Sequence, residues 1–116
     1  MIISCDFHYD SAHFLPEVPK GHKCGRMHGH TYRLTVALDG PVREDGFVID
    51  FADVKADVGH LVAQLDHRLL NDIPGLENPT VEVQLMWLWE RITLPGLAEL
   101  TLFEGLNNSA SYGGEG

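Results

Sequence analysis

The stretch that decides the fold of this 116-residue chain runs Cys24-Gly25-Arg26-Met27-His28-Gly29-His30-Thr31-Tyr32-Arg33-Leu34-Thr35-Val36-Ala37-Leu38. Its later part, from His30 to Leu38, is rich in β-branched and aromatic residues and predicts a strand. From Ile2 to Tyr9, apolar and polar side chains alternate, which predicts a strand buried on one side. Between the two, Pro16 to Gly25 contains prolines and glycines and is typical of a loop. The chain therefore opens with two strands.

Two helices are expected next. Asp50 is a typical N-cap, and the apolar residues after it recur at spacings of three and four, namely Phe51, Val54, Val58, Leu61 and Leu65. This helix should end near Asp66-His67 or one turn later. A second helix begins at Asn78-Pro79-Thr80 and stops at Pro95-Gly96; its apolar stripe consists of Val81, Leu85, Leu88 and Ile92.

Two strands complete the pattern, a third long strand from Leu100 to Phe103 and a final edge strand from Ala110 to Tyr112, joined by a turn. The apolar run Phe47-Val48-Ile49 offers a further pairing segment. The order ββααββ separates strands from helices, so we expect a single α+β domain over residues 1–116, not a doubly wound sheet. The open sheet leaves unpaired edges, which predicts an oligomer whose sheets join edge to edge.

Composition excludes several classes of protein. The formal charge of −9, from 17 acidic and 8 basic residues, argues against a nucleic-acid-binding protein, which needs a basic face. The longest apolar runs fall short of the roughly 18 residues that cross a bilayer. The first residues lack the basic start and apolar stretch of a signal peptide. We therefore expect a cytoplasmic enzyme without a nucleic-acid or membrane partner.

One basic stretch stands out in this acidic chain. It contains half of all the basic residues, and no acidic residue lies between Val18 and Leu38; its members are Lys20, Lys23, Arg26 and Arg33. A solvated loop is one interpretation. A landing zone for an anionic substrate is the other, and we favour it because the same stretch contains the histidine and cysteine cluster.

The histidines indicate a metal site. Five of the seven lie within the first 30 positions. If His28 to Leu38 is one strand, His28 and His30 point to the same face, where neutral imidazoles share a metal ion. His13 follows the first strand and offers a third nitrogen, although spacing alone does not tie it to the pair. Three nitrogen ligands leave one zinc position open, as in catalytic sites.

Cys24 has two possible roles. As a fourth ligand it would close a structural zinc site. Beside an open site, with Lys23 and Arg26 near, its thiolate would be accessible and would act as a base. Sequence spacing does not separate these roles. The other cysteine, Cys5, is expected to be a small buried residue in the first strand, without a disulfide.

Two carboxylates are further candidates. Asp66 precedes His67 at a helix end, where a carboxylate beside an imidazole resembles an orienting pair for proton transfer; an ordinary polar helix terminus is the alternative. Glu104 ends an apolar strand and would accept two hydrogen bonds from neighbouring N–H groups of a heterocycle. The alternative for Glu104 is a simple turn residue.

These motifs resemble the 6-pyruvoyl-tetrahydropterin synthase family, and within it the bacterial branch of 6-carboxy-5,6,7,8-tetrahydropterin synthases of queuosine biosynthesis. The resemblance covers nearly the whole chain and depends on the segments in combination. The matching segments are Asp10-Ser11-Ala12-His13, Gly21 to His30, Val48-Ile49-Asp50-Phe51, Leu65 to Asn71, Asn78-Pro79-Thr80-Val81-Glu82 and Phe103-Glu104.

The resemblance implies a role for each site residue. It assigns Zn²⁺ to three histidines (His13, His28 and His30), makes Cys24 the proton acceptor, pairs Asp66 with His67 as a proton relay, and makes Glu104 the anchor of a pterin ring. The implied substrate is 7,8-dihydroneopterin triphosphate, and the implied fold is the tunnelling fold, a homohexamer of two stacked trimeric rings. From charge alone, we place the triphosphate near Lys20, Lys23 and Arg26.

The spacing of the cysteine favours one branch. Cys24 precedes His28-Gly29-His30 by three intervening residues, which in this family is typical of the carboxy branch; that branch releases 6-carboxytetrahydropterin, acetaldehyde and triphosphate. The alternatives are 6-pyruvoyltetrahydropterin synthesis, action on sepiapterin, or a non-catalytic zinc-binding oligomer. Two departures from the family pattern are Tyr9 at the start of the first motif and Gly105 after the anchor glutamate.

Overall fold

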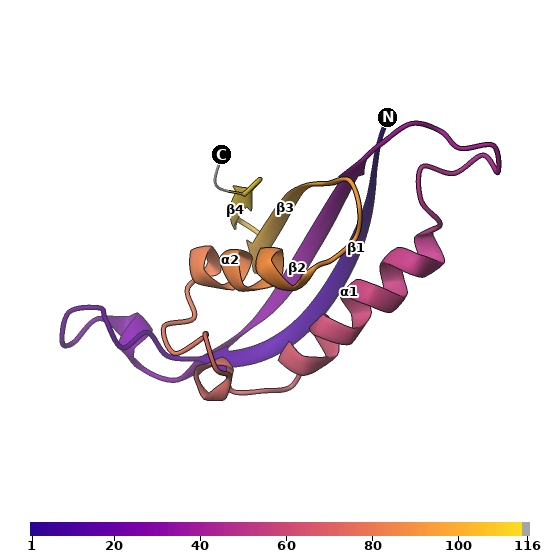
Figure 1. Ribbon diagram of the computed structural model, residues 1–116. Coiled ribbons are helices and arrows are strands. Elements are labelled where there is room, and N and C mark those ends of the chain that lie inside the picture. The colour runs from indigo at the N-terminus through magenta and orange to yellow at the C-terminus, as the bar shows by residue number, and fades with distance from the viewer. Residues whose placement is uncertain (115–116) are drawn as a thin grey trace.

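Four strands form one antiparallel sheet in the order β1-β2-β3-β4, and two α-helices pack against it (Figure 1). The computed structural model describes residues 1–114; Glu115 and Gly116, at the end of the expected domain, lie outside the described residues. The elements are β1 (Ile2–His13), η1 (Lys23–Gly25), β2 (His28–Asp39), α1 (Phe51–Leu65), η2 (Leu70–Asp72), α2 (Val81–Arg91), β3 (Leu97–Glu104) and β4 (Asn108–Tyr112). The expected ββααββ order is confirmed.

Several boundaries differ from the sequence-based expectation: α2 ends at Arg91, before Pro95-Gly96, and β4 begins at Asn108, before Ala110. β1 continues past Tyr9 to His13 because each of its last residues pairs with β2, so His13 is a strand residue and not part of the following loop. β3 begins at Leu97, directly after the turn that Gly96 makes with a φ of 77°. Residues 47–49 form no strand: the Phe47 amide donates to Asp45 and its carbonyl accepts from Arg43, so the segment closes a local turn.

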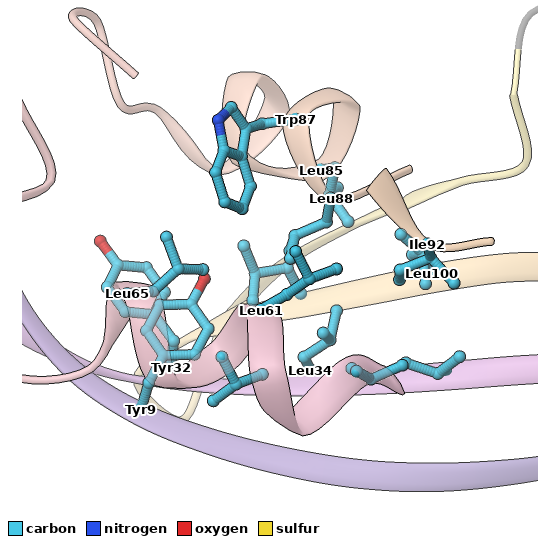
Figure 2. Packing of buried hydrophobic residues seen from close by; sticks show 14 of the residues in the cluster. Tyr9, Tyr32, Leu34, Leu61, Leu65, Leu85, Trp87, Leu88, Ile92 and Leu100 are labelled. Atoms are coloured by element: carbon cyan, nitrogen blue, oxygen red, sulfur yellow. The ribbon is translucent and has the colours of Figure 1, made fainter. Parts of the chain in front are cut away.

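One face of the sheet is buried. Along β1 and β2 every second residue faces the helices, and the strand register sets these residues opposite one another, Tyr9 facing Tyr32 and Cys5 facing Val36. Figure 2 shows the side chains of α1 and α2 closing over this face, with the rings of Tyr9 and Tyr32 beneath them. The two tyrosine rings are stacked, and their centroids are 4.9 Å apart. The core is therefore continuous from the sheet to both helices, as the alternating pattern predicts.

Side-chain caps fix where the helices begin. Asp50 accepts a hydrogen bond from the Ala52 amide at 2.9 Å, and Thr80 accepts one from Val83 at 3.1 Å. These bonds satisfy amides that have no partner within the first turn of a helix. Both N-caps agree with the expected helix starts, and Thr80 places Pro79 beside the end of β1.

After α1 the chain runs along the outer edge of β1. The His67 amide donates to the Asp10 carbonyl at 2.7 Å, and the Ala12 amide donates to Arg68 at 3.0 Å. His67 adopts a φ of 56°, which turns the chain sharply out of the helix. This segment covers the last residues of β1, while β4 forms the opposite edge of the sheet.

Among residues 1–114, neither α-helix has the length and apolar character needed to cross a bilayer.

Candidate functional site

Three histidines meet where β1 and β2 end. His13 lies opposite His28 in the strand register, and His30 lies two residues further along β2 on the same face. The Nε2 atoms of His13 and His28 are 3.0 Å apart, and one ligand atom from each of the three residues lies within 4.8 Å of the others. The expected pair is thus present, and the third nitrogen is supplied by the extension of β1. The three residues form a possible metal site.

The outward nitrogens of two of these rings are bound to backbone carbonyls. His13 Nδ1 lies 2.9 Å from the Pro79 carbonyl oxygen, and His28 Nδ1 lies 2.6 Å from that of Arg26. A carbonyl only accepts hydrogen bonds, so each Nδ1 carries the proton and each Nε2 presents a lone pair to its neighbour. Two lone pairs facing each other repel unless a cation lies between them. The donor set therefore fits a metal ion bound through nitrogen.

Burial favours the neutral form of two of the three imidazoles. It lowers the pKa of His13 and of His30 below the ordinary histidine range, against the opposing effects of the Pro79 carbonyl at His13 and of the Glu104 carboxylate at both. Neutral imidazole is the form that ligates metals. Charge and hydrogen bonding thus agree on the same state of the site.

Cys24 and Glu104 share a cavity with two of the histidines. The cavity has a volume of about 420 Å³ and is lined by Lys23, Cys24, His28, His30, Glu104 and Asn108. Glu104 enters it because β3 pairs with β2 so that Glu104 faces Tyr32 on the buried face. Its Oε1 lies 3.6 Å from His30 Nε2. A thiol, a carboxylate and a lysine therefore surround the possible metal site.

His67 lines a different cavity, and Asp66 contacts its ring. Asp66 Oδ1 is 3.0 Å from His67 Nδ1 and also accepts the Asp10 amide at 2.9 Å. The Asp10 amide and the His67 side chain lower the pKa of Asp66, in that order of importance. The cavity, about 600 Å³, is lined by Asp10, Ser11, Ala12, Gly29, His30, Thr31, His67 and Arg68. Of the proposed site residues, His30 alone lines both cavities, whereas His67 and Cys24 each line one.

The two remaining candidates from the basic stretch differ in position. Lys23 lines the cavity of Cys24. Arg26 is exposed in the loop before β2 and contributes its carbonyl to His28. In Figure 1 this loop extends beyond the sheet at the end where the histidines meet.

Sequence reasoning missed several residues at the site. The Asp10 amide orients the Asp66 carboxylate, and the Asp10 carboxylate accepts the Thr31 hydroxyl at 2.6 Å. The signal that could have indicated Asp10 is the period-two pattern of β1, which places it on the face opposite to His13. No sequence pattern indicated the Pro79 carbonyl or the Tyr32 hydroxyl, because their contacts with His13 depend on how distant elements pack. The Tyr32 hydroxyl lies 3.3 Å from His13 Nδ1.

Comparison with known proteins decides the family. The model of the family described as 6-pyruvoyl tetrahydropterin synthase matches residues 2–115. The chain belongs to the 6-pyruvoyl tetrahydropterin synthase family. The resemblance inferred from the motifs is thereby confirmed.

Relatives within the 6-pyruvoyl tetrahydropterin synthase family carry more than one name. The chain is 38% identical over 120 residues to the 6-carboxy-5,6,7,8-tetrahydropterin synthase of Synechocystis sp., covering 96% of this chain and 92% of the relative. It is 40% identical over 102 residues to the dihydroneopterin monophosphate aldolase of Pyrococcus furiosus, covering 84% and 83%. The 6-pyruvoyl tetrahydropterin synthase structure from Caenorhabditis elegans matches with a TM-score of 0.90 at 25% identity, covering 99% and 96%. The tunnelling fold expected from the sequence is therefore confirmed.

Proposed function

We propose that this protein is a zinc-dependent lyase that converts 7,8-dihydroneopterin triphosphate to 6-carboxy-5,6,7,8-tetrahydropterin, acetaldehyde and triphosphate in queuosine (7-deazaguanine) biosynthesis. The observation that carries the proposal is the cavity in which the Cys24 thiol, the Glu104 carboxylate and two histidines meet. Relatives that carry the 6-carboxytetrahydropterin synthase name support it. The reaction consumes one water molecule, and the pterin ring gains the electrons that the side-chain carbons lose, so no external reductant is needed.

His13, His28 and His30 would hold the zinc ion through nitrogen. When bound, zinc supplies Lewis acidity that lowers the pKa of a side-chain hydroxyl of the substrate. The chain's part is to keep the three rings neutral and oriented. The Pro79 and Arg26 carbonyls fix the tautomer and orientation of two of the rings, through the two Nδ1 atoms.

Cys24 would take a proton from a side-chain carbon of the substrate. Its place in the cavity that His28, His30 and Glu104 also line supports this role. Asp66 would orient His67 through Nδ1, leaving Nε2 to deliver or remove the second proton. Glu104 would bind adjacent N–H groups of the pterin ring, and Lys23 and Arg26 would attract the triphosphate.

A homohexamer would complete the site. Within one chain His67 opens to a different cavity from Cys24, and its side chain is 79% exposed. A neighbouring subunit that brings its own relay against the Cys24 cavity would join the two halves. The β1 edge before Asp10 and the β4 edge are the parts of the sheet available for such association. We propose a cytoplasmic location because both cysteines are free thiols.

The test is an assay of products. Zinc-loaded protein is incubated with 7,8-dihydroneopterin triphosphate, and acetaldehyde, triphosphate and the pterin are each quantified; we expect all three products in equal amounts. Triphosphate without acetaldehyde would mean 6-pyruvoyltetrahydropterin synthesis. Aldol cleavage that leaves the phosphates on the released fragment would instead match the aldolase relative. No turnover by zinc-loaded protein would favour a binding role.

A further inference from the structure

One buried amide has no part in the proposed chemistry. The buried polar side chains of the described residues are Ser11, His13 and Gln84. Gln84 lies on α2 and is 0% exposed, within a helix face that is otherwise apolar. A buried amide costs free energy unless it is hydrogen-bonded, so its partners indicate what it does.

The partners of Gln84 lead directly to the possible metal site. Its Nε2 donates to the Pro79 carbonyl oxygen at 3.0 Å, and His13 Nδ1 donates to the same oxygen at 2.9 Å. Its Oε1 accepts the Tyr9 hydroxyl at 2.7 Å. Tyr9 is itself 1% exposed and stacks on Tyr32 in Figure 2. Tyr9, Gln84 and the Pro79 carbonyl thus form a buried chain that ends on His13.

The direction of these hydrogen bonds is determined by chemistry. The Pro79 oxygen only accepts, so the NH₂ group of Gln84 must face it. The amide oxygen then faces Tyr9, whose hydroxyl must donate. Reversing the amide would set two oxygens against each other at Pro79. The Pro79 carbonyl therefore fixes the orientation of Gln84, Tyr9 supports that orientation by donating to the amide oxygen, and Gln84 binds the carbonyl that holds His13.

We propose that Gln84, supported by the Tyr9 hydroxyl, is a positioning residue that holds the Pro79 carbonyl in place for His13 and thereby sets the metal affinity of the three-histidine site. The inference rests on the proposed function only in taking the three histidines as metal ligands. Pro79 lies just before the N-cap of α2, and Gln84 lies in the first turns of that helix, so the amide ties the helix start to the ligand. Partners that orient a metal ligand typically change affinity by 10- to 100-fold when removed.

A purely structural role makes a different prediction. If Tyr9 and Gln84 only satisfy each other inside the core, replacing both by apolar residues of similar shape restores stability and leaves metal binding intact. If Gln84 positions His13, the same double replacement restores stability but not metal affinity, because the Pro79 carbonyl has lost its donor. The double variant separates the two roles.

The experiment compares wild type with Tyr9→Phe, Gln84→Leu and the double variant. Zn²⁺ affinity is measured by competition with a chromophoric chelator, Co²⁺ absorption spectra report the ligand geometry, and urea unfolding of the metal-free protein reports stability. Val58→Ala, a buried change on α1, is the matched control for general destabilisation.

For Gln84→Leu we expect zinc affinity to fall by about 10-fold or more, with an altered Co²⁺ spectrum. The double variant should regain the unfolding midpoint of wild type while its zinc affinity stays as low as that of Gln84→Leu. Val58→Ala should lower the midpoint and leave affinity unchanged.

Three results would overturn the inference: wild-type affinity in the double variant, an affinity loss in Val58→Ala as large as in Gln84→Leu, or a wild-type protein that binds no zinc. Because none of these measurements uses the substrate, an inactive enzyme with the expected affinities would contradict the proposed reaction alone.

Discussion

His13 and His28 face each other across the β1–β2 pair with their Nε2 atoms 3.0 Å apart, and each ring is bound to a backbone carbonyl through Nδ1. This relationship joins fold and chemistry. The strand register sets the rings opposite each other, and the carbonyls direct both lone pairs into the same space. Without a cation the arrangement is repulsive, so metal binding should stabilise the folded protein.

Zinc should therefore raise the melting temperature. A metal present at 100 times its dissociation constant contributes about 2.7 kcal/mol, which corresponds to roughly 10 °C for a domain of this size. Scanning calorimetry with zinc and with chelator measures the difference. His28→Ala should remove most of it, whereas His60→Ala, an exposed change on α1, should retain it. An unchanged zinc effect in His28→Ala would refute the three-histidine site.

Cys24 distinguishes an open metal site from a closed one. If Cys24 is the base, Cys24→Ala should lower kcat by about 10²- to 10⁴-fold while the zinc content stays at the wild-type level. Cys5→Ala, the other free thiol and buried in β1, is the control and should remain active. The measurements are acetaldehyde release and bound zinc. Loss of zinc in Cys24→Ala would identify the thiol as a fourth ligand and the site as structural.

The residues of the site differ in how well the sequence patterns could predict their positions. Period-two alternation predicted that His28 and His30 share a face, and that is where they lie. His13 joined them only through the length of β1, which depends on pairing with β2 and not on local propensity. The position of His67 was less predictable still. It depends on a left-handed φ of 56° at a non-glycine residue, which is held by the hydrogen bond from the His67 amide to the Asp10 carbonyl. No local residue preference predicts that turn.

Asp66 should contribute to the acid sensitivity of folding. The Asp10 amide and His67 lower its pKa below the ordinary aspartate value of about 3.9. A carboxyl whose pKa is lower in the folded state stabilises the fold above its unfolded pKa, and this contribution disappears as the pH falls through the folded pKa. When the pH is lowered from 5 to 3, the free energy of unfolding of Asp66→Asn should therefore fall less than that of wild type.

Urea unfolding at both pH values measures this difference. Asp6 and Asp45 also have lowered pKa values, through bonds to Thr35 and Phe47 respectively, so some acid sensitivity should remain in the variant. Glu99→Gln, an exposed change on β3, is the matched control and should behave as wild type. An Asp66→Asn protein with the full acid sensitivity of wild type would show that the Asp10–Asp66 bond does not contribute.

Two glycines should respond to alanine in opposite directions. Gly96 has a φ of 77°, and an added Cβ would overlap the carbonyl oxygen of Asp39, whose amide donates to the Gly96 carbonyl at 2.8 Å. Strain in the left-handed region and this overlap should together cost about 2 kcal/mol or more. Gly59 lies inside α1 with no atom near its missing Cβ, so alanine there should stabilise by about 0.5–1 kcal/mol.

Denaturant unfolding of Gly96→Ala and Gly59→Ala shows whether each substitution lowers or raises the free energy of unfolding. The Gly96 turn sets the register in which β3 leaves α2 and pairs with β2, and that register carries Glu104 to the cavity of Cys24. Gly96→Ala should therefore lower activity as well as stability, while Gly59→Ala should leave activity unchanged. Equal effects of the two substitutions would mean that the turn at Gly96 does not control the pairing of β3.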